Sequence, residues 1–122
     1  AIETQGFRVL LMSDAGSITE DTLVRRHGAE LCSDILVLGR HGEDVFATQE
    51  FLEAVRPRLI VLAQADPFRE GSGEPALRER LDATGAAIFD QTECGAVTLT
   101  FSDGRAHARG FLNGRSTTLE RR

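Results

Sequence analysis

The chain contains no lysine, so all 14 of its basic residues are arginine. A phosphate-binding loop needs the combination Gly-Lys-Ser/Thr, in which the lysine reaches the phosphates. A response-regulator-like receiver domain also needs a lysine near its phosphoryl site. The absence of lysine therefore excludes the first kind of loop and argues against a receiver, although the chain shares a receiver's alternation of strands and helices.

Long apolar runs are also absent. The run Leu59–Ala63 is typical of the longest stretches, whereas a membrane-spanning helix needs about 20 apolar residues. The chain has no charged n-region followed by an apolar h-region, so no signal peptide is expected. Because it begins at Ala1 without a methionine, we interpret it as part of a longer protein whose targeting signal would lie elsewhere.

The chain has fewer basic residues (14) than acidic residues (19). The net charge is −5 and the pI is about 5.2, which argues against a surface that coats nucleic acid over its whole extent. Arginine side chains could still contact phosphates locally, because the guanidinium group forms forked hydrogen bonds.

Cysteine is limited to Cys32 and Cys94, which form neither a Cys-x-x-Cys pair nor a zinc-knuckle spacing. Two interpretations stay open. The cysteines are buried free thiols, or they form a disulfide if the compartment is oxidising. The turn Glu93-Cys94-Gly95 resembles a nucleophilic turn, but no histidine pairs with it, so we interpret Cys94 as a packing residue.

Apolar patterning predicts a layered α/β domain of mostly parallel strands with crossover helices and a terminal antiparallel hairpin. Helices are expected from 18 to about 26, where Ser17 and Glu20 form a capping-box pattern, from Thr48 to Pro57, and from 75 to 85. An Asp-Gly turn at 103–104 predicts the hairpin. We expect one domain over residues 1–112 and a loose polar tail over residues 113–122. The expected strands are 7–13, 35–38, 59–63, 86–89, 97–101 and 106–112.

Chemistry-bearing residues follow two of the expected buried strands. Asp14 comes directly after the strand that ends at Ser13, and His41 lies in a glycine-lined turn after the strand that ends at Leu38. Functional loops of parallel sheets lie at the carboxyl ends of the strands. We therefore expect Asp14, the turn 40–43 and the loop 64–74 on one edge of the sheet.

Five segments, in order, resemble the C-terminal half of the metallo-β-lactamase-like domain of ComEC-type DNA-internalisation (competence) proteins. The family has a strand ending in Thr-Gly-Asp, then Ala-Asp-Ile-Leu leading to Gly-His-His-Gly-Ser, then Phe-Leu-Glu-Ala-Val-x-Pro, Gly-His-Pro and a Gly-Ala-Val strand. The resemblance covers about residues 7–101, and the family's His-x-His-x-Asp-His motif is absent from this chain. The matching segments are 7–15, 33–43, 51–57, 73–75 and 95–99.

The resemblance implies a binuclear metal site that this chain has in part. Asp14 matches the family's bridging aspartate, and His41 matches one histidine of its His-His pair. Arg40 replaces the other histidine, Glu43 replaces the serine and Glu74 replaces the histidine of Gly-His-Pro. A guanidinium cannot ligate zinc and repels it. The substitutions therefore favour a degenerate site with no cofactor, in which Arg40 pairs with Asp14 or contacts a phosphate or nucleic acid.

The alternative is an active, metal-dependent nuclease or phosphodiesterase. It would keep Asp14 and His41 as ligands, with Glu74 as a substitute oxygen donor, and would take its remaining ligands for zinc or manganese from upstream of this chain. The isolated chain is expected to be catalytically inert, because even an intact family site needs the missing motif. His27, at a helix end, and His107, expected on an edge strand, are interpreted as structural.

The family also implies a cellular setting. The parent protein would lie in the bacterial inner membrane, with a membrane channel as the neighbour of this domain. The domain itself would be soluble and extracytoplasmic, with single-stranded DNA as its candidate partner. We thus expect an accessory or DNA-contacting module of a DNA-uptake protein.

Overall fold

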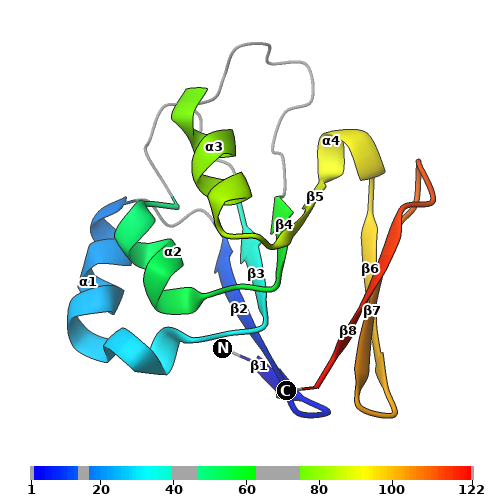
Figure 1. The fold of residues 1–122 in the computed structure, drawn as a ribbon, viewed down its shortest axis with the longest axis horizontal. Coiled ribbons are helices and arrows are strands. Elements are labelled where there is room, and N and C mark those ends of the chain that lie inside the picture. Colours follow the sequence, from blue (N-terminus) through cyan, green and yellow to red (C-terminus); the bar gives the residue numbers. More distant parts are fainter. Residues whose placement is uncertain (1, 14–16, 40–46, 63–74, 122) are drawn as a thin grey trace.

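The computed structural model describes residues 2–13, 17–39, 47–62 and 75–121. These residues form a five-stranded sheet, with strands in the order β1-β2-β3-β4-β5, and a separate three-stranded sheet, β6-β7-β8 (Figure 1). The strands are β1 (Ile2–Thr4), β2 (Phe7–Ser13), β3 (Ile35–Leu38), β4 (Leu59–Leu62), β5 (Ala87–Asp90), β6 (Val97–Ser102), β7 (Arg105–Gly110) and β8 (Ser116–Glu120). The helices are α1 (Ser17–His27), the 3-10 helix η1 (Gly28–Leu31), α2 (Gln49–Val55), α3 (Pro75–Ala83) and α4 (Gln91–Cys94).

The larger sheet is mostly parallel, as predicted. Strands β2 to β5 run parallel, and α1, α2 and α3 lie between successive members of this series. Strand β1 pairs antiparallel with β2 at the sheet edge. The predicted α/β class and the crossover helices are therefore confirmed.

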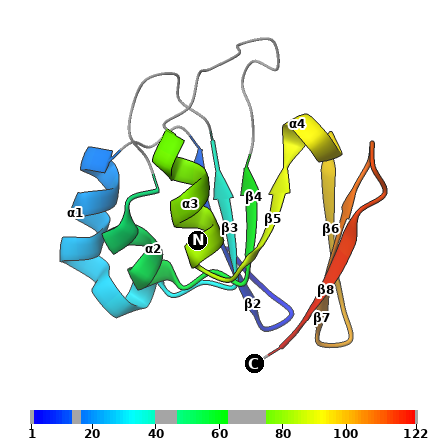
Figure 2. The same cartoon turned by 45° about the horizontal axis from the view of Figure 1, so that its top comes forward.

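Two apolar layers cover opposite faces of this sheet, because alternate residues of a strand point to opposite sides. On one face, Leu36, Leu38 and Ile60 pack with the buried side chains of α2 and α3. On the other face, Ile35 and Val61 pack with residues of β6 and β7. The chain thus forms three layers, with helices on one side of the central sheet and the antiparallel sheet on the other (Figure 2).

Local sequence signals explain the helix ends. Thr48 caps α2, since its side-chain oxygen accepts a hydrogen bond from the Phe51 N–H at 3.4 Å. The helix ends at Val55, before Pro57, and Arg56 adopts a left-handed conformation with φ 51°. Both features match the prediction for this segment.

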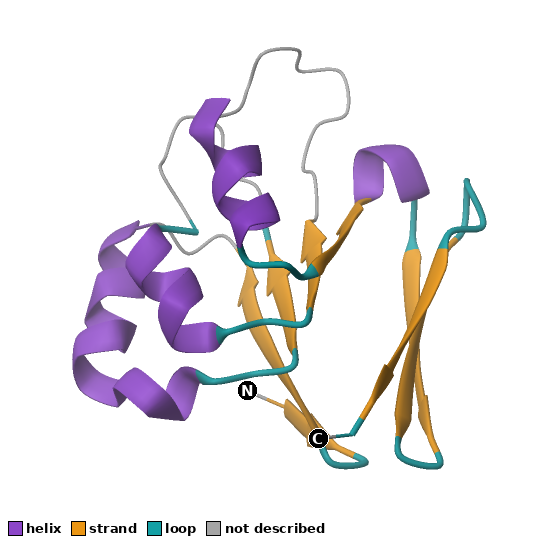
Figure 3. Cartoon of the chain, in the orientation of Figure 1, coloured by secondary structure: helices purple, strands orange, loops and turns teal. Residues whose placement is uncertain are grey.

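The C-terminal region corrects two expectations. The predicted hairpin is present, with Asp103 and Gly104 at positive φ in its turn, but β8 adds a third strand beside β7 (Figure 3). The tail expected over residues 113–122 is therefore not loose at Ser116–Glu120, which is hydrogen-bonded into the sheet. The assignment of residues 1–112 to a domain of their own stays a prediction.

Candidate functional site at the carboxyl ends of the parallel strands

The carboxyl ends of β2, β3, β4 and β5 meet at one edge of the larger sheet. Ser13 is in register with Leu38, Leu38 with Leu62, and Leu62 with Asp90. The last described residues of these strands therefore lie side by side. This register supports the expectation that the loops after the strands share one edge.

The five residues predicted for the site lie in the segments attached to this edge. Asp14 follows β2 directly, the turn with Arg40, His41 and Glu43 follows β3, and Glu74 precedes α3. All five lie outside the described residues. Their ligand, ion-pair and phosphate-contact roles consequently stay predictions.

Asp90 is a further acidic residue at a strand end, and the sequence reasoning missed it. It ends β5, is half-buried, and lies beside Leu62 at the edge from which the predicted site segments leave. The signal was available, because an apolar strand followed directly by an aspartate is also the pattern that singled out Asp14. Asp90 adds a carboxylate to this end of the sheet.

The carboxylate of Glu20 binds the backbone of Ala47 and Thr48, directly after the segment 40–46. Glu20 on α1 is fully buried, and its carboxylate accepts hydrogen bonds from the Ala47 N–H at 2.6 Å and the Thr48 N–H at 2.9 Å. On the same stretch, the Arg80 Nε–H of α3 donates to the Ala47 carbonyl at 2.9 Å. Helices α1 and α3 thus fix the backbone from which α2 starts.

Burial dominates the ionisation of this group. Removal from water raises the pKa of Glu20, and the two backbone N–H groups and the positive charge of Arg80 offset that rise in part. The capping-box prediction missed this role. Glu20 binds the backbone 27 and 28 residues further along the chain.

A second carboxylate joins the opposite, amino-terminal ends of the strands. Asp34 accepts a hydrogen bond from the Arg8 N–H at 2.9 Å and pairs with the Arg58 guanidinium at 3.3 Å. Its carbonyl also accepts from the Arg58 and Leu59 N–H groups. These bonds join the amino-terminal part of β2 to the starts of β3 and β4. In this chain, the Asp-Ile-Leu part of the family resemblance therefore has a structural role.

The remaining cysteines and histidines are placed as follows. Both cysteines are free thiols, and Cys94 is fully buried, which agrees with its interpretation as a packing residue. His27 ends α1, and its Nδ1 lies 3.5 Å from the Glu30 carboxylate. His107 was expected on an edge strand, but β7 is the central strand of its sheet.

Within residues 2–13, 17–39, 47–62 and 75–121, no three His, Cys, Asp or Glu side chains are grouped so that they could hold a metal ion.

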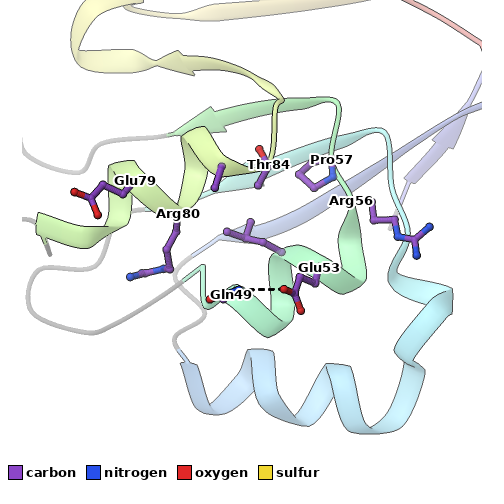
Figure 4. A pocket seen from close by; sticks show the side chains of 9 residues that line it. Gln49, Glu53, Arg56, Pro57, Glu79, Arg80 and Thr84 are labelled. Carbon is purple, nitrogen blue, oxygen red and sulfur yellow. Dashed lines mark hydrogen bonds between the residues drawn. The ribbon is translucent and has the colours of Figure 1, made fainter.

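A groove of about 680 Å³ lies between α2 and α3, on the helical side of the sheet (Figure 4). Its rim carries both signs of charge, with Glu53 and Glu79 against Arg56 and Arg80, and Gln49 hydrogen-bonds to Glu53 at 3.1 Å. Its apolar surface comes from Leu52, Pro57 and Ala83. Arg80 therefore both lines the groove and holds Ala47.

The described elements define an α/β domain with a mostly parallel sheet, backed by a small antiparallel sheet. The chain is similar to the competence protein ComA of Neisseria gonorrhoeae, with 28% identity over 104 residues. This alignment takes in 85% of the chain and 15% of ComA, so the chain spans a small part of that relative.

The other comparisons add no relative. No protein-family model matches the chain, and no solved structure gives a significant match. Among the described helices, none is both long enough and apolar enough to cross a membrane.

Proposed function

We propose that this chain is a domain of a DNA-uptake protein, in which it acts as an accessory or DNA-contacting module. The similarity to the competence protein ComA over 85% of the chain carries this proposal. The resemblance to the C-terminal half of a metallo-β-lactamase-like domain is the second support. On the same grounds, we propose that the parent protein lies in the bacterial inner membrane and that this domain lies on its extracytoplasmic side.

The chemistry of the strand-end residues favours a degenerate metal site. A catalytic zinc ion takes three protein ligands, and this chain offers Asp14 and His41 at the positions that match the family. Arg40 places a permanent positive charge next to His41 in the sequence, and that charge opposes a second one nearby. An ion pair between Arg40 and Asp14 would take the place of a metal–carboxylate contact.

The alternative function is a metal-dependent nuclease or phosphodiesterase. Its support is that Asp14 and His41 belong to segments that follow β2 and β3, whose carboxyl ends lie at one edge of the sheet, and that Glu74 belongs to the segment between β4 and α3. Glu74 would then supply an oxygen ligand, and further ligands for zinc or manganese would come from another part of the parent protein.

A chimera tests the DNA-uptake role directly. The matching region of Neisseria gonorrhoeae ComA is replaced by this chain in a strain that lacks ComA, and the frequency of transformation by chromosomal DNA is measured. We expect the chimera to restore transformation, whereas a chimera without this region does not. Failure to restore transformation, in cells that contain the chimera in wild-type amounts, would contradict the proposal.

A second chimera separates the two functions. It carries Asp14→Ala and His41→Ala, which remove both family-matched ligands and leave the described contacts in place. A non-catalytic module predicts the same transformation frequency as the first chimera. Loss of transformation in this variant alone would instead support the metal-dependent alternative.

A further inference from the structure

The outer face of the antiparallel sheet carries a row of positive and polar side chains. Along β7, Arg105, His107 and Arg109 are exposed, while Ala106 and Ala108 are buried against the larger sheet. Alternation along a strand puts the first three on one face, with about 6.8 Å between neighbours. Two guanidinium groups on this row are far enough apart to contact separate phosphates.

Hydroxyl groups flank this row on both sides. Arg109 is in register with Thr98 of β6 and Ser116 of β8, and all three side chains are exposed. The next row pairs His107 with exposed Thr100 and Thr118, and the His107 Nδ1 lies 3.0 Å from the Thr118 hydroxyl. Hydroxyl side chains are among the groups that proteins use to bind phosphate oxygens.

The last row contains the only acidic residue among the outward-facing residues of β6, β7 and β8. Arg105 lies between Ser102 and Glu120, and its Nε is 3.8 Å from the Glu120 carboxylate. An exposed pair at this distance is weak. The outward-facing residues of this sheet thus carry two positive charges and one negative charge, whereas the whole chain has a net charge of −5.

An exposed aromatic ring lies in the turn directly after β7. Phe111 is 80% exposed and stands two residues after Arg109. Its backbone is fixed, because the Phe111 N–H donates to the Ala96 carbonyl at 2.9 Å and the next N–H, of Leu112, donates to Cys94. This turn lies at the same end of the molecule as the carboxyl ends of β3 to β5 (Figure 1). Unpaired bases stack on exposed aromatic rings held in this way.

We propose that the outer face of β6, β7 and β8 binds single-stranded DNA. Arg105 and Arg109 contact phosphates, the flanking hydroxyls assist them, and Phe111 stacks on a base. This inference rests on the proposed DNA-uptake function and adds to it a binding surface made of other residues than the strand-end ones. It chooses a single strand over a duplex, because a duplex keeps its bases stacked away from Phe111.

The test uses the full 122-residue chain and a fluorescein-labelled oligothymidylate, with binding followed by fluorescence anisotropy at several salt concentrations. The double variant Arg105→Gln/Arg109→Gln removes two phosphate contacts. Each contact to a single strand contributes about 0.7 to the slope of log K against log salt. We expect the slope to fall by about 1.4 and the affinity at 0.1 M salt to fall roughly 25-fold.

The matched control is Arg25→Gln/Arg78→Gln. It removes the same charge from exposed positions on α1 and α3, where each arginine pairs with an aspartate four residues away. We expect this control to bind close to wild type. A separate variant, Phe111→Ala, is expected to lose about fivefold or more in affinity without a change in salt slope, because stacking releases no counterions.

Several results would overturn the inference. The sheet variant could bind as wild type does, or the control could lose as much affinity, which would indicate a response to net charge alone. A duplex or an RNA of the same length could bind more tightly than the single strand. Absence of any binding by the wild-type chain also counts against it. The transformation assay of the chimera judges the DNA-uptake function separately, and thermal unfolding confirms that each variant is folded.

Discussion

Replacing Glu20 by alanine is expected to lower the free energy of unfolding by about 3 kcal/mol. The substitution leaves the Ala47 and Thr48 N–H groups without their acceptor, in a place where the Glu20 side chain is fully buried. An unsatisfied buried donor costs about 1–3 kcal/mol. The relief from no longer burying a carboxylate offsets part of the sum, which gives the figure of about 3 kcal/mol.

The isosteric variant Glu20→Gln separates charge from shape. Its amide has one oxygen, so it accepts from one of the two N–H groups and turns an NH₂ toward the other. We expect a smaller loss of about 1–2 kcal/mol near neutral pH. This loss reports the charge and the second acceptor together, since the glutamine fills the same volume.

The difference in stability between the wild type and Glu20→Gln should change with pH in one direction. Burial raises the pKa of Glu20 in the folded state above its ordinary value of 4.5, so the folded chain binds this proton more tightly than the unfolded chain. The contribution of Glu20 to stability is therefore fully present below pH 4.5 and is lost as pH rises through the folded pKa. Relative to Glu20→Gln, the wild type should lose stability over that interval.

Urea unfolding followed by circular dichroism, repeated across this pH range, measures all three proteins. A loss below about 0.5 kcal/mol for Glu20→Ala would refute the reasoning, because surface substitutions already produce changes of that size. A wild type that gains stability over Glu20→Gln as pH rises would refute the sign. Hydrogen exchange at the Thr48 amide gives a local check, since this N–H should exchange faster in the alanine variant.

Three further changes test how the antiparallel sheet is built. Gly110→Ala places a methyl group 2.7 Å from the Cys94 Cβ and should cost about 1–3 kcal/mol in urea unfolding, whereas no loss would contradict the close contact. Gly104→Ala, at φ 74°, should cost about 1 kcal/mol, and an unchanged midpoint would contradict the turn. Arg115→Leu removes a guanidinium 4.7 Å from the centre of the Phe89 ring and should cost about 1 kcal/mol, and it should leave m unchanged.

Elements with strong local signals could be predicted from the sequence. The run from Ile35 to Leu38 is apolar throughout because both faces of β3 are covered, and Thr48 caps α2 through an atom three residues from its partner. Such signals depend on neighbours in the chain. Strand β8 has no such signal, since Leu119 is the one apolar residue of Ser116–Glu120. This segment is a strand because it pairs with β7.

Long-range contacts explain why the role of Glu20 was missed and why His107 was misplaced. Glu20 stands three residues after Ser17 and matches a local cap, yet its hydrogen-bond donors lie on the segment before α2. His107 was placed on an edge because the strand beyond it could not be foreseen. For the candidate site, the strand register supports the shared edge, whereas the side-chain contacts of Asp14 and His41 depend on loops that local patterns do not specify.

The metal content of the parent protein tests most directly whether this domain is a non-catalytic module. The protein is purified without chelators, and zinc and manganese are counted per chain by mass spectrometry, for the wild type and for Asp14→Ala. We predict well below one ion per chain in both, because Arg40 stands where the family has a metal ligand. One or more ions per wild-type chain, lost in Asp14→Ala, would contradict this account and establish the metal-dependent alternative.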